Sequence, residues 1–204
     1  MTQERIVFVH GDGQFGAAAW PRQHGLALDF DCLFLRRHGF DAGADADDEL
    51  LPTDHAEDQR IIIEALGTGG HLVAHAEGAV PAMLTAVERP DLIHSLTLVE
   101  PACLSLTADL PATAAHIQLV SPLFARRDQA PPWTAPLHIV PGVPTLVLTG
   151  GWEPLYEEVA GYLADTGARH RITAGGHRPH DTAEGDAVIR GFIRGAPSGE
   201  SDEE

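Results

Sequence analysis

The chain has 204 residues, with 13 Arg, 30 Asp plus Glu and 12 His, and it contains neither Lys nor Asn. Without Lys it cannot form a Schiff base or supply the phosphate-binding lysine of a Walker A loop. The net charge of −17 repels nucleic acid and anionic membranes, so neither is expected as a partner. The length and the hydrophobic content of 44% fit one globular domain with a sizeable core.

The number of cysteines and the lack of a long apolar run indicate in which cellular compartment the protein is expected. Cys32 and Cys103 are too few for a disulfide framework and are typical of a reducing compartment. No stretch of 18 apolar residues and no signal-like start is visible, so we expect a cytoplasmic protein. The acidic segment 197–204 is expected to be a disordered tail.

Short apolar runs rich in Val, Ile and Leu alternate with segments of helical spacing. The runs, which favour buried parallel strands, are 6–9, 32–35, 71–74, 96–99, 145–149 and 171–173. Helices are expected at 54–66, capped by Thr53, at 79–88 and at 155–164, where Glu157 and Glu158 are expected on a solvated face. This alternation predicts a doubly wound α/β domain with a mainly parallel six-strand sheet of order 2-1-3-4-5-6.

The segment 101–144 interrupts this alternation, since it holds eight of the 15 prolines. Its portion 112–124 has the spacing of a short helix. Long irregular excursions in compact domains are usually lids or binding loops, although a merely tolerated insertion is the alternative. We therefore predict one domain, 1–196, with a lid at about 101–143.

Two strand-to-loop junctions carry the residues of chemical interest. The first expected strand runs into His10, Gly11 and Asp12, and the third runs into His75, Ala76 and Glu77. The carboxyl ends of parallel strands are where open α/β sheets bind ligands. We expect a crevice there, with glycines that allow the backbone to approach a substrate closely.

Four motifs in order resemble those of the α/β-hydrolase family. Val9-His10-Gly11 is similar to the oxyanion loop, and 71–84 with 89–101 resembles the nucleophile elbow and the strand after it. The segments 149–154 and 174–177 resemble the acid and histidine loops. The resemblance covers nearly the whole chain and implies a short member of that family.

One residue departs from the family pattern. Where Gly-x-Ser-x-Gly would place serine, this sequence has Ala76 within Ala74-His75-Ala76-Glu77-Gly78, and a methyl group cannot attack a carbonyl. The sequence leaves open whether Ala76 is native or a replacement.

The resemblance assigns roles to the other site residues. His177 matches the general base, and Glu153 matches the acid that orients it, with Glu100 as the competing acid. The oxyanion hole would use the backbone N–H groups of Asp12 and Glu77, and the Glu77 side chain is a less favoured acid or base.

Substrate contacts are expected from residues of the crevice and from aromatic side chains near it. His10, Gly11 and Trp152 are the named candidates, and the aromatic residues that suggest an apolar acyl pocket are Phe15, Trp20, Phe124, Trp133 and Trp152.

Other chemistries have weaker support. His71 with His75, and His177 with His180, have no third metal ligand in the sequence, so neither a metal nor another cofactor is expected. Cys103 lacks a neighbouring positive charge and fits a buried small residue. Gly11-Asp12-Gly13 fails the dinucleotide fingerprint, which leaves nucleotide binding as a minor alternative.

The sequence therefore predicts a protein that acts on small apolar esters, thioesters or related acyl compounds. Two alternatives remain: a non-hydrolytic acid–base catalyst of elimination, cyclisation or water activation, and a catalytically silent ligand-binding protein. The oligomeric state does not follow from the sequence.

Overall fold

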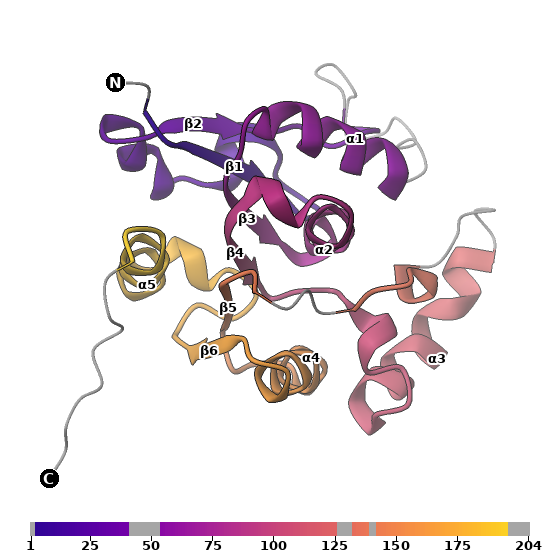
Figure 1. Ribbon diagram of the computed structural model, residues 1–204. Helices are drawn as coiled ribbons and strands as arrows, with labels where there is room; N and C mark the ends of the chain where they lie inside the picture. Colours follow the sequence, from indigo (N-terminus) through magenta and orange to yellow (C-terminus); the bar gives the residue numbers. More distant parts are fainter. Residues whose placement is uncertain (1–2, 41–53, 126–131, 139–141, 196–204) are drawn as a thin grey trace, which may run out of the picture.

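The protein is built around one parallel six-stranded sheet (Figure 1). The computed structural model describes residues 3–40, 54–125, 132–138 and 142–195. The strands are β1 (Arg5–Val9), β2 (Asp31–Phe34), β3 (Gly70–His75), β4 (Ile93–Val99), β5 (Thr145–Thr149) and β6 (Arg169–Ile172). Their order is β2-β1-β3-β4-β5-β6, which confirms the predicted fold class and strand order.

Helices cover both faces of the sheet (Figure 1). On one face lie α1 (His55–Leu66), α2 (Ala79–Glu88) and α4 (Pro154–Asp165), and on the other lie α5 (Ala183–Ile193) and the 3-10 turn Gln23–Leu28. Because successive strand residues point to opposite faces, Leu72 and Val73 of β3 enter different cores. Trp20 and Phe8 fill the α5 side, with ring centroids 5.2 Å apart.

Capping sets the start of α1. The Asp54 side chain accepts hydrogen bonds from the backbone N–H groups of Ala56 and Glu57 at 3.0 and 3.1 Å. The carboxylate also favours the positive end of the helix dipole. The expected cap Thr53 lies outside the described residues, and Asp54 takes this role.

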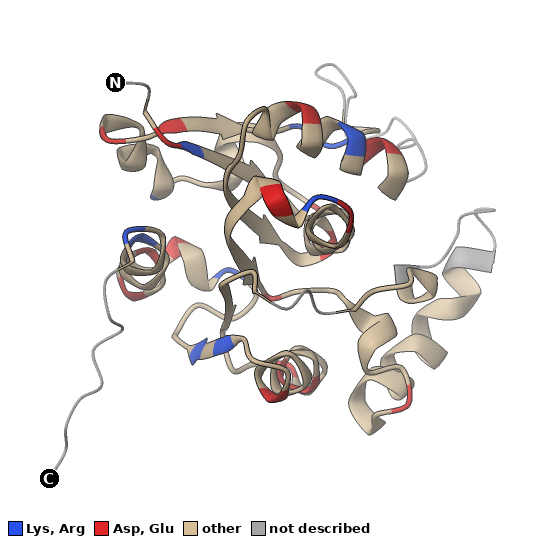
Figure 2. Cartoon of the chain, in the orientation of Figure 1, with Lys and Arg blue, Asp and Glu red and all other residues tan. Residues whose placement is uncertain are grey.

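The segment after β4 contains a longer helix than expected, α3 (Pro111–Ala125). α3 carries no charged residue (Figure 2), and Leu119 and Leu123 on it are exposed. Its first turn is held by Glu158 of α4, whose carboxylate accepts from the backbone N–H groups of Ala112 and Thr113, both at 2.8 Å. Glu158 is partly exposed and also binds the start of α3, a contact that the sequence did not predict. Burial opposes ionisation, but these hydrogen bonds outweigh it and lower the pKa of Glu158.

Residues 126–131 and 139–141 of the predicted lid, and the whole predicted tail 197–204, lie outside the described residues, so both the lid and the tail stay predictions. Within the part of the chain that the structure describes, no helix has the length and apolar character needed to cross a membrane.

Candidate functional site

The turn after β3 holds the residue in the nucleophile position. Ala76 is fully buried and has φ of +49°, a left-handed conformation that costs a non-glycine residue roughly 1 kcal/mol. A sharp strand-to-helix turn of this kind is the geometry of a nucleophile elbow. At Gly78 an added Cβ would lie 2.5 Å from the carbonyl oxygen of His10, so this position must be glycine. The elbow is thus present, with a methyl group in place of a nucleophile.

Glu100 lies directly after β4 and is held as a buried carboxylate. Its Oε1 accepts from the backbone N–H of Gly150 at 2.5 Å, and its Oε2 accepts from the indole N–H of Trp152 at 2.9 Å. Its backbone is also in the left-handed region, with φ of +45°. Hydrogen-bond donors to both oxygens fix the orientation of the carboxyl group.

His177 lies on the loop between β6 and α5, beside Glu100. Its Nδ1 is 3.7 Å from Glu100 Oε2, an ion-pair distance that is too long for a hydrogen bond. The same nitrogen is buried without a hydrogen-bond partner. Catalytic hydrogen bonds are often long before substrate binds, so this pair has the geometry of a general base and its orienting acid.

Glu153, the other candidate acid, occupies a different position. It is the residue before α4, and its side chain makes no capping hydrogen bond there. Among the described residues no hydrogen bond or ion pair joins Glu153 to His177, whereas Glu100 faces the imidazole directly. The geometry therefore places Glu100, and not Glu153, beside the His177 imidazole.

His75 holds the loop that carries His177, a role that the sequence did not predict. Its Nε2–H donates to the backbone oxygen of His177 at 2.8 Å, and the two ring centroids are 4.7 Å apart. Burial is the main cause that lowers the pKa of His75 well below 6.5, and the neighbouring His180 and His177 lower it further. The ring of His75 is therefore neutral. The signal in the sequence was its position immediately before the elbow.

Glu77 places a second carboxyl group at the elbow. Burial of the carboxyl and then the negative charge of Asp12 raise its pKa, while its own backbone N–H and Arg37 act in the opposite direction. Glu77, the residue after Ala76, therefore carries a carboxyl group with a raised pKa at the elbow.

The first loop supports the elbow but does not expose every expected residue. His10 is fully buried, with Nδ1 2.6 Å from the Gly11 carbonyl oxygen and Nε2 accepting from the backbone N–H of Arg37 at 3.0 Å. The expectation that His10 contacts substrate is therefore wrong, because both ring nitrogens are engaged inside the protein. Gly11 does lie against the elbow, since an added Cβ would be 2.7 Å from Ala76 Cβ.

Two of the aromatic candidates, Trp20 and Trp152, lie in different surroundings. Trp20 belongs to the core, while Trp152 is half exposed, with its ring centroid 5.7 Å from that of His177. Tyr156 adds a further ring at 5.3 Å from His177 that the sequence reasoning did not select. Burial is the main cause that raises the pKa of Tyr156, and the neighbouring Glu77 raises it further. The Tyr156 hydroxyl is therefore neutral.

A separate apolar cavity of about 310 Å³ lies between α2 and α4, away from the elbow. Its lining includes Met83, Leu98, Leu163 and Val143, and neither Ala76 nor His177 borders it. It does not correspond to the acyl pocket that the sequence predicted at the crevice.

Structural comparisons place this architecture among known folds. NosK from Streptomyces actuosus matches with a TM-score of 0.64 and 21% identity, covering 95% of this chain and 99% of that one. The thioesterase domain from the curacin biosynthetic pathway matches with a TM-score of 0.59 and 20% identity, covering 94% and 91%. A carboxylesterase of the thaumarchaeon Nitrososphaera gargenis matches with a TM-score of 0.64 and 14% identity, covering 94% and 90%.

These neighbours share one architecture, and the chain has the α/β-hydrolase fold. No protein-family model matches the chain, and no curated protein matches it in sequence. The likeness at these identities defines the fold, so the chemistry has to be argued from the site residues.

Proposed function

We propose that the protein hydrolyses small apolar ester or thioester substrates, with a water molecule activated by His177 in place of a serine nucleophile. The observation that carries the proposal is the His177–Glu100 pair, held at 3.7 Å beside an elbow whose side chain is a methyl group. A left-handed alanine and a fully buried carboxylate both cost stability. Their presence together supports a working site that does not need the serine.

The proposed reaction is a direct hydrolysis. The oxygen of water bonds to the substrate carbonyl carbon while His177 takes a proton from that water, and Glu100 stabilises the resulting imidazolium. The bond from that carbon to the leaving oxygen or sulfur then breaks, and His177 returns the proton to the leaving group. The backbone N–H groups of Asp12 and Glu77 would stabilise the oxyanion, each by a few kcal/mol.

The solved neighbours agree with an acyl substrate. They include a protein described as a thioesterase domain and one described as a carboxylesterase. The rings of Trp152 and Tyr156 beside His177 supply apolar surface for a small acyl or aromatic group.

Hydrolysis of p-nitrophenyl acetate and of a short-chain acyl thioester tests the proposal. We expect saturable turnover by the chain as it stands, and a drop in kcat/KM of about 100-fold or more in His177→Gln. His24→Gln, which changes an exposed histidine, controls for ester cleavage by surface imidazoles. Equal turnover in all three proteins would overturn the proposal.

Ala76→Ser tests the covalent route separately. If the elbow is intact, the new serine should react with a fluorophosphonate probe, and the reaction should require His177. Labelling of Ala76→Ser together with turnover by the unmodified chain supports two routes on one site. If Ala76→Ser is labelled but the unmodified chain shows no turnover, the unmodified chain is inactive because Ala76 replaces the serine.

A second candidate function follows from Ala76 itself. With a methyl group at the elbow, the crevice could bind an acyl compound and retain it unchanged. Saturable binding of a non-hydrolysable acyl analogue that is unaffected by His177→Gln, with no turnover, would favour this function over catalysis.

A further inference from the structure

A second cluster of functional side chains lies at the opposite end of the sheet from the elbow. Glu4 precedes β1, His71 is the second residue of β3, and His94 is the second residue of β4. One ligand atom from each lies within 4.8 Å of the other two. The elbow begins five residues after His71, roughly 16 Å along an extended strand, so this cluster is separate from the crevice.

An irregularity in the β3–β4 pairing brings His94 into the cluster. Gly70 pairs with Ile93 and His71 pairs with Ser95, so His94 is an extra residue in β4. Bulges of this kind redirect a side chain that regular alternation would send to the other face. Here the bulge allows His94 Nδ1 to lie 2.7 Å from Glu4 Oε1.

His71 shows an unmet requirement of the cluster. Its side chain is only 8% exposed, and its Nε2 has no hydrogen-bond partner although Glu4 Oε1 is 3.2 Å away. Its Nδ1 lies 2.8 Å from Ser95 Oγ. With Nδ1–H donating to that hydroxyl, the Nε2 lone pair faces a carboxylate oxygen and is free to bind a cation, whereas the other tautomer would donate Nε2–H to Glu4.

We propose that Glu4, His71 and His94 bind a divalent metal ion of the zinc type. Two imidazole nitrogens and one carboxylate oxygen form a ligand set that Zn²⁺ accepts, with a fourth position left for water. Ligand atoms around tetrahedral zinc are about 3.3 Å apart at usual bond lengths. The separations of Glu4 Oε1 from His94 Nδ1 and from His71 Nε2, 2.7 and 3.2 Å, are close to this value, and all three ligand atoms lie within 4.8 Å of one another.

Ser95 would orient this site from outside the ligand set. A ligating histidine normally donates its other ring N–H to a fixed acceptor, and Ser95 Oγ offers that acceptor to His71. The site would fasten the segment before β1 to the starts of β3 and β4. The sequence offered His71 only a pairing with His75, because Glu4 and His94 join it through the sheet register.

Zinc binding to the full-length, EDTA-treated protein tests the proposal by isothermal titration and thermal denaturation. We expect one saturable site and a Tm that rises with Zn²⁺. Glu4→Gln and His94→Gln should each weaken binding by about tenfold or more, and Ser95→Ala by about tenfold. Glu4 and His94 are about half exposed, so both variants should fold where a His71 variant could fail.

Two controls locate the ion. His24→Gln and His177→Gln should bind Zn²⁺ as the unmodified protein does, since neither residue belongs to the cluster. Loss of the site in His177→Gln, equal affinity in Glu4→Gln and His94→Gln, or no saturable binding by the unmodified protein would each overturn the proposal.

Discussion

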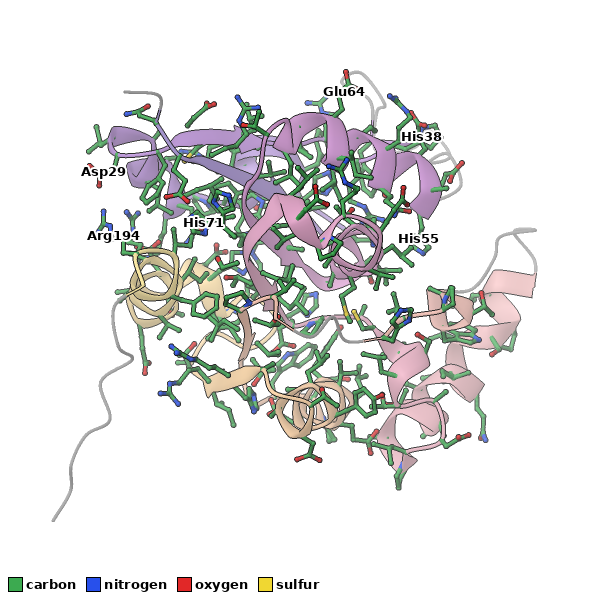
Figure 3. The ribbon with its side chains drawn as sticks, viewed as in Figure 1. Asp29, His38, His55, Glu64, His71 and Arg194 are labelled. Atoms are coloured by element: carbon green, nitrogen blue, oxygen red, sulfur yellow. The ribbon has the colours of Figure 1, made fainter. Side chains whose placement is uncertain are left out.

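The two ends of β3 place the same residue type in opposite situations. His71 and His75 are four residues apart on one strand, so they point to the same face of the sheet. Burial lowers the pKa of both below 6.5. His75 Nε2 meets the carbonyl oxygen of His177, whereas His71 Nε2 meets the carboxylate of Glu4 (His71 is labelled in Figure 3).

This difference shows how a shared local sequence pattern can serve two chemistries. A neutral histidine opposite a carbonyl oxygen donates its proton and fixes a loop. A neutral histidine opposite a carboxylate can offer a lone pair to a cation only in the tautomer whose other ring N–H is donated elsewhere, which is the role proposed for the His71–Ser95 contact. β3 sets the position and the burial of both histidines, and the group that each one faces comes from a neighbouring segment of the chain.

Acid should weaken the carboxyl end of the sheet most. Burial lowers the pKa of His10 and of His180 to about 4, and that of His75 well below 6.5. Between pH 6.5 and about 4 the unfolded chain therefore binds more protons, so stability present above pH 6.5 is lost as pH falls. Urea denaturation should show a loss of roughly 3–5 kcal/mol by about pH 5.

One variant isolates part of this effect. Gln at position 10 can donate to the Gly11 carbonyl and accept from the Arg37 N–H, but it does not titrate. His10→Gln should flatten the pH dependence by about 2 kcal/mol over the same range. The raised pKa of Glu77 acts in the opposite direction, and a flat pH profile in the unmodified protein would contradict the neutral buried histidines.

Glu100→Gln should reduce the proposed hydrolytic activity more than a change of any other carboxylate near His177. Gly150 N–H and Trp152 N–H bind different oxygens of Glu100, and in glutamine one of these becomes an NH2 group that cannot accept. The neutral amide also lacks the charge that would stabilise an imidazolium at His177. We expect kcat/KM for the acyl ester to fall about 100-fold or more. Glu153→Gln is the matched control and should keep at least half of the activity; the reverse ranking would make Glu153 the acid.

Gly78→Ala should damage the elbow by steric overlap. The new methyl group would lie 2.5 Å from the His10 carbonyl oxygen and 2.9 Å from that of Val9, both backbone atoms. We expect a loss of about 2–3 kcal/mol in the free energy of unfolding, measured in urea. Gly191→Ala, in α5 with open space around it, should instead be neutral or stabilise by about 0.5–1 kcal/mol.

Without metal, the Glu4–His71–His94 cluster at the amino end of the sheet should contribute little to the free energy of unfolding. His94 and Glu4 are about half exposed, and pairs of that kind are worth about 0–1 kcal/mol. His94→Gln in metal-free buffer should therefore change the free energy of unfolding by less than about 1 kcal/mol. A larger loss without metal would mean that the cluster is a structural ion pair in its own right.

The strand pattern was predictable because buried parallel strands are continuous apolar runs. Each of the six strands overlaps its predicted run, and the ends move by up to three residues because ladder pairing extends beyond the apolar core. The helix α5 was missed, since the sequence reasoning singled out the loop before it and not the apolar spacing of Ile189 and Ile193.

The site was predictable in part. The elbow, the histidine loop and the two candidate acids could be found as motifs, because each lies at the end of a strand. The position of Glu100, rather than Glu153, beside His177 could not be predicted, since it depends on which carboxyl group the Gly150 and Trp152 donors reach.

The sequence by itself predicted the α/β-hydrolase fold and showed Ala76 where the family motif has serine, because both follow from local patterns of a few residues. The tertiary structure alone decided that Glu100 faces His177, that His10 is buried, and that Glu4, His71 and His94 meet. The physical reason is sheet register: it joins residues that are far apart in the chain, and one bulged residue changes which side chains meet.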